Sequence, residues 1–540
     1  SHCPGLLSEI VVFLNRTAFA LMTFLTALAS FGTAQDEKPV DILLRGATLY
    51  DGIGEEPTQG DVAIRGDRIV AIGKSLDIPA VWKIDCSKHV ICPGFIDLHN
   101  HADRRIVKAE TRANMNFVTQ GCTTVVTGNC GSGPVDVAAY YKILDEHGAG
   151  TNVAHLLPQG SLRDDVMGTA LRKPTDKELA EMAKLAEKAM RDGAWGMSTG
   201  LIYVPSSYAE TDELISLAKI VSRHGGIYAS HIRGEGSTLL TSVAEALQIG
   251  RDANLPVHVS HFKSSGRSHW GLVRRAAEEI QKARDAGQVV TADQYPYIAS
   301  STSLDATLLP AWARAGGREE LLKRFEDAEI GPRLRDHVAQ RLDEGNGGES
   351  IRIARYSPNP EWAGQSLRAI AETEKRDAIE VAYEIFRGGG AQIVNFSMSE
   401  DDVRHIMAID WVATASDGGA YLPGADRPHP RNYGTFPRKI RYYSLDEKVI
   451  PHGKAIRSAT SLPADILGLK DRGRLQVGQF ADVVVFDPKK IRDEATFSNP
   501  HQYSTGIRFV FVNGTPAIAE GIPTGTLSGR PLQHQSTAEE

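Results

Sequence analysis

Six side chains that could bind a metal ion stand directly after short apolar segments of this sequence. They are four histidines, one cysteine and one aspartate: His99, His101, Cys130, His231, His261 and Asp417. His99 and His101 alternate along an extended segment, so both imidazoles project to the same side. Thiolate and imidazole donors suit Zn²⁺, whereas hard cations are bound mostly by carboxylate oxygens. The residue types therefore predict a zinc site.

The aspartate of this group could transfer protons during a hydrolytic reaction. Bound zinc lowers the pKa of water from ~15.7 to about 7 and polarises a carbonyl oxygen. Asp417 could then take the proton from that water and pass it to a leaving nitrogen. Each residue alone has a structural explanation: Cys130 as a buried thiol, the histidines as core residues, and Asp417 as a turn residue within Ser416–Gly419. Their shared placement favours a hydrolytic metal site, with Asp417 as the catalytic residue.

The elements that must position these residues alternate between apolar strands and amphipathic helices. Strands are expected at residues 90–98, 123–127, 152–157, 196–199, 226–230, 256–260, 289–292 and 412–416. Helices are expected between several of them, at 176–192, 237–253 and 271–286. Eight such strands predict an α/β fold of the TIM-type (β/α)8 class, in which active sites lie at the carboxyl ends of the strands. A ninth candidate strand, at residues 392–397, exceeds the eight strands that such a barrel needs.

The two ends of the chain are rich in β-strand patterns broken by Gly and Asp turns. We expect residues 37–92 and 470–540 to form one small β-sandwich domain, although two unrelated β-segments are the alternative. The barrel would then occupy residues 93–469. An insertion around 304–405, helical in part, would lie over the barrel mouth.

Residues 1–36 have the order of a secretory signal. Arg16 precedes the apolar run from Ala18 to Phe31, and the small residues Gly32, Thr33 and Ala34 follow it. The run is too short for a confident transmembrane span, so no stable membrane insertion is expected after processing. Cleavage predicts an exported protein, periplasmic or extracellular. An uncleaved segment would instead leave a membrane-anchored or cytoplasmic protein.

The composition points to a small-molecule substrate. The chain has 540 residues, 41% of them hydrophobic and 24% charged, and a formal net charge of −7. That charge and the lack of a basic strip give no reason to expect nucleic acid as a partner. Five cysteines, an odd number without CxxC spacing, do not suggest a disulfide framework.

Several motifs resemble one known family. Residues 93–101 (PGFIDLHNH) resemble the first-strand signature of the amidohydrolase superfamily. Five further motifs look like those of the N-acyl-D-amino-acid deacylases, or D-aminoacylases: 128–131 (GNCG), 196–201 (GMSTGL), 230–235 (SHIRGE), 260–263 (SHFK) and 429–438 (HPRNYGTFPR). The resemblance runs from about residue 40 to about residue 514.

This resemblance implies roles for individual residues. A tightly bound zinc would be held by Cys130, His231 and His261, and a second, weaker metal position would be framed by His99, His101 and Asp417. The small anionic N-acyl amino acid substrate would be bound through its carboxylate by Lys263, Tyr295 and Arg431, with Tyr203 and Ser301 nearby. A cationic clamp also makes chemical sense, because arginine binds a carboxylate bidentately and lysine adds a point charge.

Two other functions compete with hydrolysis of linear N-acyl-D-amino acids. A cyclic-amide hydrolase of the dihydroorotase or hydantoinase type would carry a bridging carboxylated lysine, where this chain has Cys130. A non-catalytic exported metal-binding protein would have no need of Asp417. One departure from the family is Leu157-Pro158-Gln159-Gly160, where relatives carry Gly-His. The motifs leave the side-chain preference open among neutral D-residues, D-glutamate and D-aspartate, and they do not define the oligomeric state.

Overall fold

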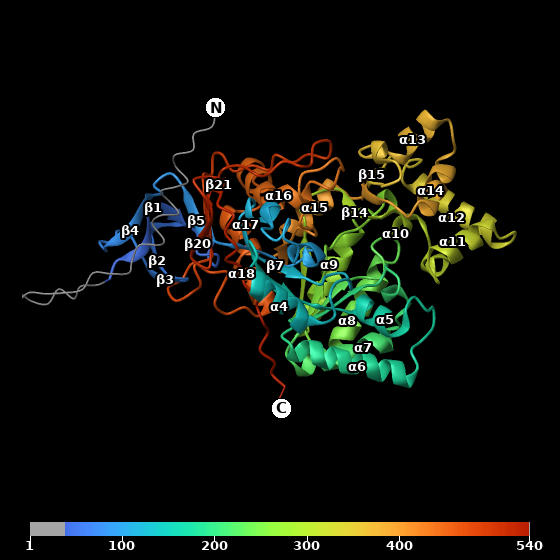
Figure 1. Ribbon diagram of the computed structural model, residues 1–540, viewed down its shortest axis with the longest axis horizontal. Coiled ribbons are helices and arrows are strands. Elements are labelled where there is room, and N and C mark those ends of the chain that lie inside the picture. Colours follow the sequence, from blue (N-terminus) through green and yellow to red (C-terminus); the bar gives the residue numbers. More distant parts are fainter. Residues whose placement is uncertain (1–37, 539–540) are drawn as a thin grey trace, which may run out of the picture. The chain divides into compact units, whose positions relative to one another are not determined.

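The computed structural model describes residues 38–538, and the fold reported below is that of the compact unit that begins at Val40 (Figure 1). The export signal expected at residues 1–36 lies outside the described residues. Between residues 38 and 538, no helix combines the length and the apolar character needed to cross a membrane.

Eight parallel strands form a barrel. In chain order they are β6 (Phe95–Asp97), β7 (Cys122–Thr127), β8 with its continuation β9 (Asn152–His155 and Leu157–Pro158), β10 (Gly196–Gly200), β11 (Ile227–His231), β12 (Val257–Val259), β13 (Val290–Gln294) and β17 (Val412–Thr414). β6, β7 and β8 pair in one sheet, and β9 to β13 pair with β17 in another. A parallel bridge between Asn100 and Gly418 joins the last strand to the first. The predicted (β/α)8 barrel is confirmed.

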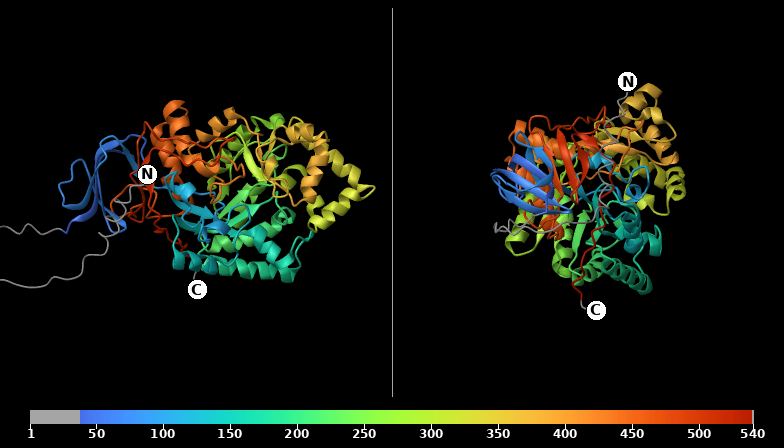
Figure 2. Two further views of the ribbon diagram at one scale, coloured as in Figure 1. Left: turned by 45° about the horizontal axis from the view of Figure 1, so that its top comes forward. Right: turned by 60° about the vertical axis from the view of Figure 1, so that its left-hand side comes forward.

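Amphipathic helices connect the strands and cover the outside of the barrel (Figure 2). α6 (Asp176–Arg191) shows how the sequence sets such a helix, because a capping box fixes its start. The Glu178 N–H donates to the Thr175 hydroxyl at 3.3 Å, and the Thr175 N–H donates to the Glu178 carboxylate at 2.8 Å. α8 (Leu239–Ala253) and α9 (Leu272–Asp285) likewise turn one apolar face toward the strands.

The segment expected as a single first strand is divided between the two domains at Gly94. β5 (Val90–Pro93) pairs with the C-terminal β-segment, whereas β6 begins the barrel. The Gly94 N–H donates to the Asp482 carbonyl at 2.8 Å. A side chain at this position would collide with the barrel, since a Cβ would lie 2.1 Å from the Thr123 hydroxyl oxygen. Glycine therefore allows the close approach at the junction.

Strands from both chain ends form the smaller β-domain. Apart from β5, they are β1 (Val40–Leu49), β2 (Thr58–Arg65), β3 (Arg68–Gly73), β4 (Ala80–Asp85), β18 (Val483–Phe486), β19 (Ile507–Val512), β20 (Thr515–Ala519) and β21 (Ile522–Pro523). They make one nine-stranded hydrogen-bonded network, in which β1 pairs with β2, β4 and β5. Leu44 and Ile64 from the first segment share an apolar core with Val485 and Phe509 from the second.

The ninth candidate strand belongs to the insertion and not to the barrel. It is β16 (Gln392–Asn395), the middle strand of an antiparallel sheet with β14 (Ser300–Ser303) and β15 (Ile351–Arg355). The intervening helices are α10 (Leu304–Leu308), α11 (Arg318–Glu326), α12 (Ile330–Glu344), α13 (Leu367–Glu374) and α14 (Ala378–Arg387). These elements have their own apolar core, which is separate from that of the barrel.

Candidate active site

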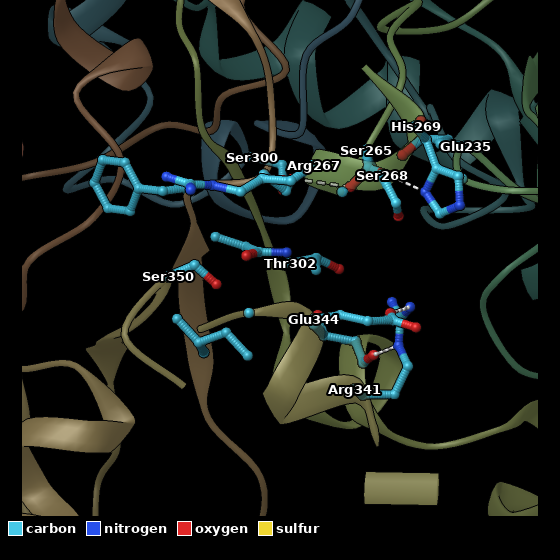
Figure 3. Close-up of a pocket in the computed structure, with 18 of the residues that line it drawn as sticks. Glu235, Ser265, Arg267, Ser268, His269, Ser300, Thr302, Arg341, Glu344 and Ser350 are labelled. Carbon is cyan, nitrogen blue, oxygen red and sulfur yellow. Dashed lines mark hydrogen bonds and ion pairs between the residues drawn. The ribbon is translucent and has the colours of Figure 1, made fainter. Parts of the chain in front are cut away.

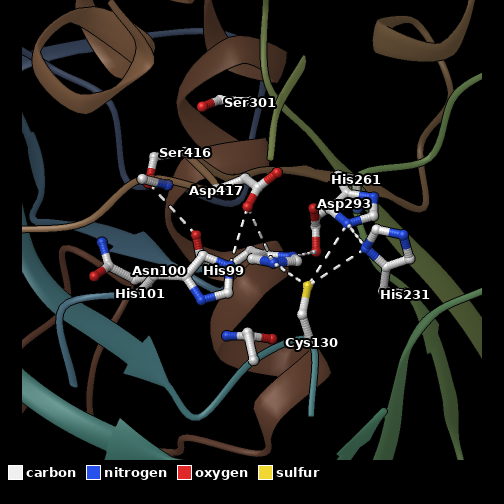
Figure 4. Close-up of polar contacts among 12 residues, drawn as sticks. His99, Asn100, His101, Cys130, His231, His261, Asp293, Ser301, Ser416 and Asp417 are labelled. Atoms are coloured by element: carbon white, nitrogen blue, oxygen red, sulfur yellow. Dashed lines mark hydrogen bonds and ion pairs between the residues drawn. The ribbon is translucent and has the colours of Figure 1, made fainter. Parts of the chain in front are cut away.

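All six predicted metal-binding residues lie at the carboxyl ends of barrel strands (Figure 4). His99 and His101 follow β6, and Cys130 follows β7. His231 ends β11, His261 follows β12 and Asp417 follows β17. Every one of these side chains except that of His101 is buried. The barrel topology thus brings residues that are up to 318 positions apart in sequence (99 to 417) to one place.

The Cys130 sulfur is the centre of the first donor group. It lies 3.2 Å from His99 Nε2, 3.6 Å from His231 Nδ1 and 3.7 Å from His261 Nε2. In tetrahedral zinc sites, Zn–S is about 2.3 Å and Zn–N about 2.0–2.1 Å, so neighbouring ligand atoms are roughly 3.3–3.6 Å apart. The sulfur-to-nitrogen distances agree with that spacing. The 2.7 Å between His231 Nδ1 and His261 Nε2 is shorter, and a shared ion would separate them slightly.

A second donor group adjoins the first. Asp417 Oδ1 lies 3.1 Å from His101 Nε2 and 3.5 Å from His99 Nε2. His99 therefore contacts both Cys130 and Asp417, and the two groups are contiguous. The arrangement can hold two cations side by side.

Three of these residues adopt backbone conformations that are unusual for residues with a side chain. φ is +52° at Cys130, +36° at His261 and +52° at Asp417. Left-handed conformations of this kind cost about 1–3 kcal/mol each and persist where the surrounding fold imposes them. Here each turns the chain sharply at a strand end, which aims the side chain across the barrel mouth.

Electrostatics keep the sulfur and the carboxylate ionised. Burial would raise the pKa of Cys130, but the charge of His99 and hydrogen bonds from neighbouring imidazoles hold it well below its usual value. Burial would likewise raise the pKa of Asp417, but Arg431 and His99 outweigh burial and lower it well below the usual range. An anionic sulfur and carboxylate are the forms needed for metal binding and for accepting a proton.

A cavity of about 560 Å³ opens over these donors. Three of the five predicted substrate-binding residues line it: Arg431, Tyr203 and Ser301. Arg431 Nη1 lies 2.9 Å from Asp417 Oδ2, and its Nη2 donates to the Ser301 carbonyl at 3.2 Å. The Tyr203 hydroxyl lies 2.9 Å from Thr302 Oγ1. A cation thus lies next to the candidate base in a cavity large enough for a small molecule.

The other two, Lys263 and Tyr295, lie behind the cavity wall. The Tyr295 ring centroid is 4.7 Å from the Arg431 guanidinium carbon and 5.7 Å from Lys263 Nζ. Its hydroxyl donates to the Met398 sulfur at 3.7 Å. Lys263 Nζ donates to Glu235 Oε1 at 2.6 Å. In this conformation the tyrosine and the lysine support Arg431 and His261 and are not exposed to a ligand in the cavity.

Comparison with known proteins decides the family. The family model described as "Amidohydrolase family" matches residues 83–518. The chain belongs to the amidohydrolase family. It is 37% identical to the D-aminoacylase of Alcaligenes xylosoxydans xylosoxydans over 523 residues, which cover 92% of this chain and 98% of that protein.

Two further relatives of this amidohydrolase are similar over comparable lengths. The N-acyl-D-glutamate deacylase of Alcaligenes xylosoxydans xylosoxydans is 34% identical, over 90% of this chain and 96% of its own. The crystal structure of N-acyl-D-glutamate deacylase from Bordetella bronchiseptica, complexed with zinc and a phosphonate that mimics the tetrahedral intermediate, superimposes with a TM-score of 0.78. It is 32% identical and covers 92% of this chain and 100% of that one.

The sequence-based prediction missed a buried carboxylate beneath the candidate metal donors of this amidohydrolase. Asp293, at the end of β13, accepts the His261 N–H at 2.7 Å and lies 3.4 Å from His99 Nδ1. His258 Nε2 contacts the same carboxylate at 2.8 Å. Carboxylates that contact metal-binding imidazoles fix their ring orientation and tautomer. Asp293 directly follows the strand predicted at residues 289–292, and this placement could have indicated its role in the site.

Glu235 is a second carboxylate that the prediction missed. Its Oε1 lies 3.0 Å from His261 Nδ1 and 2.6 Å from Lys263 Nζ. Burial would raise the pKa of Glu235, but Lys263 and His261 lower it far below its usual value. Glu235 therefore remains an anion that orients His261 from the side opposite to Cys130. It stands in the quoted motif SHIRGE, five residues after Ser230.

Asp97 ties the first and last strands together below the site. Its carboxylate accepts from the Ser416 N–H at 2.8 Å, from the Ser416 hydroxyl and from the Asn100 amide at 2.8 Å. Burial raises the pKa of Asp97 to about 6, against the lowering effect of these donors. The contacts fix the turns that carry His99 and Asp417.

The departure from the family at residues 157–160 has a structural role. Gln159 donates to Glu213 at 3.2 Å and accepts from the Ser206 hydroxyl at 2.6 Å. His155 contacts Thr127 and the Pro134 carbonyl and lies in neither donor group. This part of the amidohydrolase shapes the cavity wall through Gly160 and contributes no metal donor.

Proposed function

We propose that this chain is a zinc-dependent hydrolase that cleaves the amide bond of N-acyl-D-amino acids. The observation that carries the proposal is the Cys130 sulfur 3.2–3.7 Å from three imidazole nitrogens, with the Asp417 carboxylate beside them. The similarity to D-aminoacylase and N-acyl-D-glutamate deacylase supports the substrate class. The products are a carboxylate and a free D-amino acid.

Cys130, His231 and His261 would hold the tighter ion. His99, His101 and Asp417 would frame a second, weaker position, since their donor atoms also lie within reach of one cation. The bound metal supplies a water of lowered pKa and an electrophile for the amide carbonyl. Asp293 and Glu235 hold the imidazoles in the orientation that this binding requires.

Asp417 moves the proton in this mechanism. Its carboxylate faces the same cavity as Cys130 and His101, so it can accept a proton from the attacking water there. The same carboxyl group then donates that proton to the departing nitrogen. Two proton transfers by one positioned group avoid the expulsion of an amide anion.

Arg431 binds the substrate carboxylate. It is the guanidinium that lines the cavity next to Asp417, and a guanidinium matches the geometry of a carboxylate. Tyr203 and Ser301 line the same region and offer hydroxyl groups. Lys263 and Tyr295 add positive potential and packing from behind, and Lys263 would reach the substrate only if it left Glu235.

A paired substrate screen tests this function. N-acetyl derivatives of D- and L-leucine, methionine, glutamate and aspartate are incubated with the protein, with zinc added or with a chelator. We expect release of the D-amino acid from at least one D-substrate, at least tenfold slower reaction of its L-enantiomer, and loss of activity on chelation that zinc restores. Hydrolysis of L-substrates alone, or activity unaffected by metal removal, would contradict the proposal.

We also propose that the chain is exported after removal of residues 1–36. The support is the order of charged, apolar and small residues in that segment. N-terminal sequencing of the protein recovered from the periplasmic or secreted fraction of an expressing bacterium tests this. A mature N-terminus near residue 36 is expected, and full-length protein confined to the cytoplasm would contradict it.

A further inference from the structure

A second cavity, of about 700 Å³, lies beside the active-site cavity. Its wall includes the segments that follow β10, β11 and β12 on the barrel side, and α10, α12 and the three-stranded sheet on the insertion side. Figure 3 shows Glu235, Ser265 and His269 on one side of the space and Arg341 with Glu344 on the other. The volume is within the range of small-molecule sites, about 300–1,000 Å³.

The second cavity adjoins the substrate cavity and reaches Glu235, which contacts the candidate metal donor His261. Thr302 lines both cavities, and its hydroxyl bonds to Tyr203, which lines the first. Glu235 lines the second cavity and contacts both His261 and Lys263. A substrate group that extended from the reacting centre past Thr302 would therefore enter this second space.

Polar groups dominate the lining. Hydroxyl groups and side-chain amides outnumber apolar side chains, as Ser265, Ser300, Ser350, Asn346 and Asn395 illustrate. An apolar substrate side chain would strip water from these groups without replacing its hydrogen bonds, which is unfavourable. The wall instead suits a ligand that offers hydrogen-bond acceptors and donors.

Two arginine side chains that line the second cavity are not paired with carboxylates within residues 38–538. Arg267 and Arg352 contact the rings of Trp270 and Phe396, with the guanidinium carbons 5.5 and 4.6 Å from the ring centroids. Across residues 38–538, neither makes an ion pair. In contrast, the carboxylates of the lining already have partners: Glu235 pairs with Lys263, Glu344 with Arg341, and Glu349 accepts from the Ser366 hydroxyl.

We propose that the second cavity is a subsite for a polar, carboxylate-bearing side chain of the substrate, which Arg267 and Arg352 bind. The inference rests on the proposed deacylase function and narrows its substrate class to N-acyl-D-amino acids with an acidic side chain. The carboxylate has two possible sources, an acidic residue itself or a further residue attached to its side chain. The volume accommodates either.

Four substrates separate these cases. They are N-acetyl-D-glutamate, N-acetyl-D-glutamate carrying glycine on its side-chain carboxyl, the neutral isostere N-acetyl-D-glutamine, and N-acetyl-D-leucine. With the zinc-loaded full chain, we expect kcat/KM for one of the first two to exceed that for the last two by at least tenfold. Whichever acidic substrate is better identifies the source of the carboxylate.

Variants then test the assignment of the two arginines. Arg267→Gln and Arg352→Gln are each expected to lower kcat/KM for the preferred acidic substrate about tenfold or more, and to leave that for N-acetyl-D-leucine unchanged. Arg387→Gln is the matched control, since Arg387 stacks on Tyr383 in the same insertion and lines neither cavity. It is expected to change neither value.

The outcomes distinguish this inference from the proposed function. The subsite would be overturned, and the deacylase function left standing, if neither acidic substrate were hydrolysed faster than N-acetyl-D-leucine, or if an acidic preference survived both Arg→Gln substitutions. Failure of the wild-type protein to hydrolyse any N-acyl-D-amino acid would overturn the function, and the subsite with it.

Discussion

Arg431 and Asp417 form a buried ion pair at the barrel mouth, with Nη1 2.9 Å from Oδ2. The group proposed to bind the substrate carboxylate therefore contacts the group proposed to move the proton. The other oxygen of Asp417 lies 3.1 Å from His101 Nε2. A substrate carboxylate must share or displace part of this pairing, so binding and proton transfer are coupled through one guanidinium.

Replacement of this arginine should affect two kinetic constants. Arg431→Lys keeps the positive charge but loses the planar guanidinium. The charge-assisted contacts with the substrate carboxylate and with Asp417 are therefore weakened. We expect KM to rise and kcat to fall, with kcat/KM about 10–100-fold lower, as for loss of about 1.5–3 kcal/mol. Steady-state kinetics on the best N-acetyl-D-amino acid measure both constants. A rise in KM alone would show that Arg431 does not act on Asp417.

Asp417→Asn should separate catalysis from metal binding. The amide cannot accept the proton of the attacking water, so we expect kcat to fall by about 10²–10⁴-fold. The tightly held zinc should remain, because Cys130, His231 and His261 are unchanged. Zinc content by atomic emission and kcat are measured together, with Asp145→Asn on the exposed surface as the control. Wild-type turnover in Asp417→Asn would remove Asp417 from the mechanism.

Residue type and strand ends were enough to predict the barrel and the convergence of the six side chains, because parallel strands bring their carboxyl ends together. The division of the first strand at Gly94 was not predictable, since an unbroken apolar run looks the same in either domain. Residues 392–397 looked like a ninth barrel strand for a similar reason, because the sequence of a short apolar strand does not indicate which sheet the strand joins. Asp293 and Glu235 were missed because their role depends on contacts with His99 and His261.

Asp293→Asn should weaken zinc binding without removing a ligand. The amide would no longer offer a charged acceptor to His99 and to the His261 backbone, so their orientation would be held less firmly. We expect a zinc affinity 10–100-fold lower, measured by competition with a chromophoric chelator. Asp402→Asn is the matched control, since Asp402 is also buried but accepts from Ser264, Gly271 and Arg274 and not from a metal-binding imidazole within residues 38–538. Equal losses in both variants would indicate a general structural effect.

Asp97 should make the fold less stable as pH rises from about 4 to 6. Its pKa is raised from 3.8 to about 6 by burial, so the native state holds a proton that the unfolded state has released. Stability therefore falls with rising pH across this window, by up to about 3 kcal/mol for roughly two pKa units. Thermal unfolding from pH 4 to 7 measures the trend. Asp97→Asn should not show this pH-dependent loss of stability. An equally steep fall of stability with pH in the variant would contradict the assignment to Asp97.

The claim that Cys130 and the neighbouring imidazoles bind one zinc ion is tested most directly by zinc K-edge X-ray absorption of the purified protein. We expect one sulfur at about 2.3 Å and nitrogen or oxygen ligands at about 2.0–2.1 Å. The sulfur shell should disappear in Cys130→Ser and persist in Cys122→Ala, because Cys122 lies in an apolar cluster away from the donors. A zinc ion without sulfur in the wild type, or a sulfur shell that survives Cys130→Ser, would contradict the account.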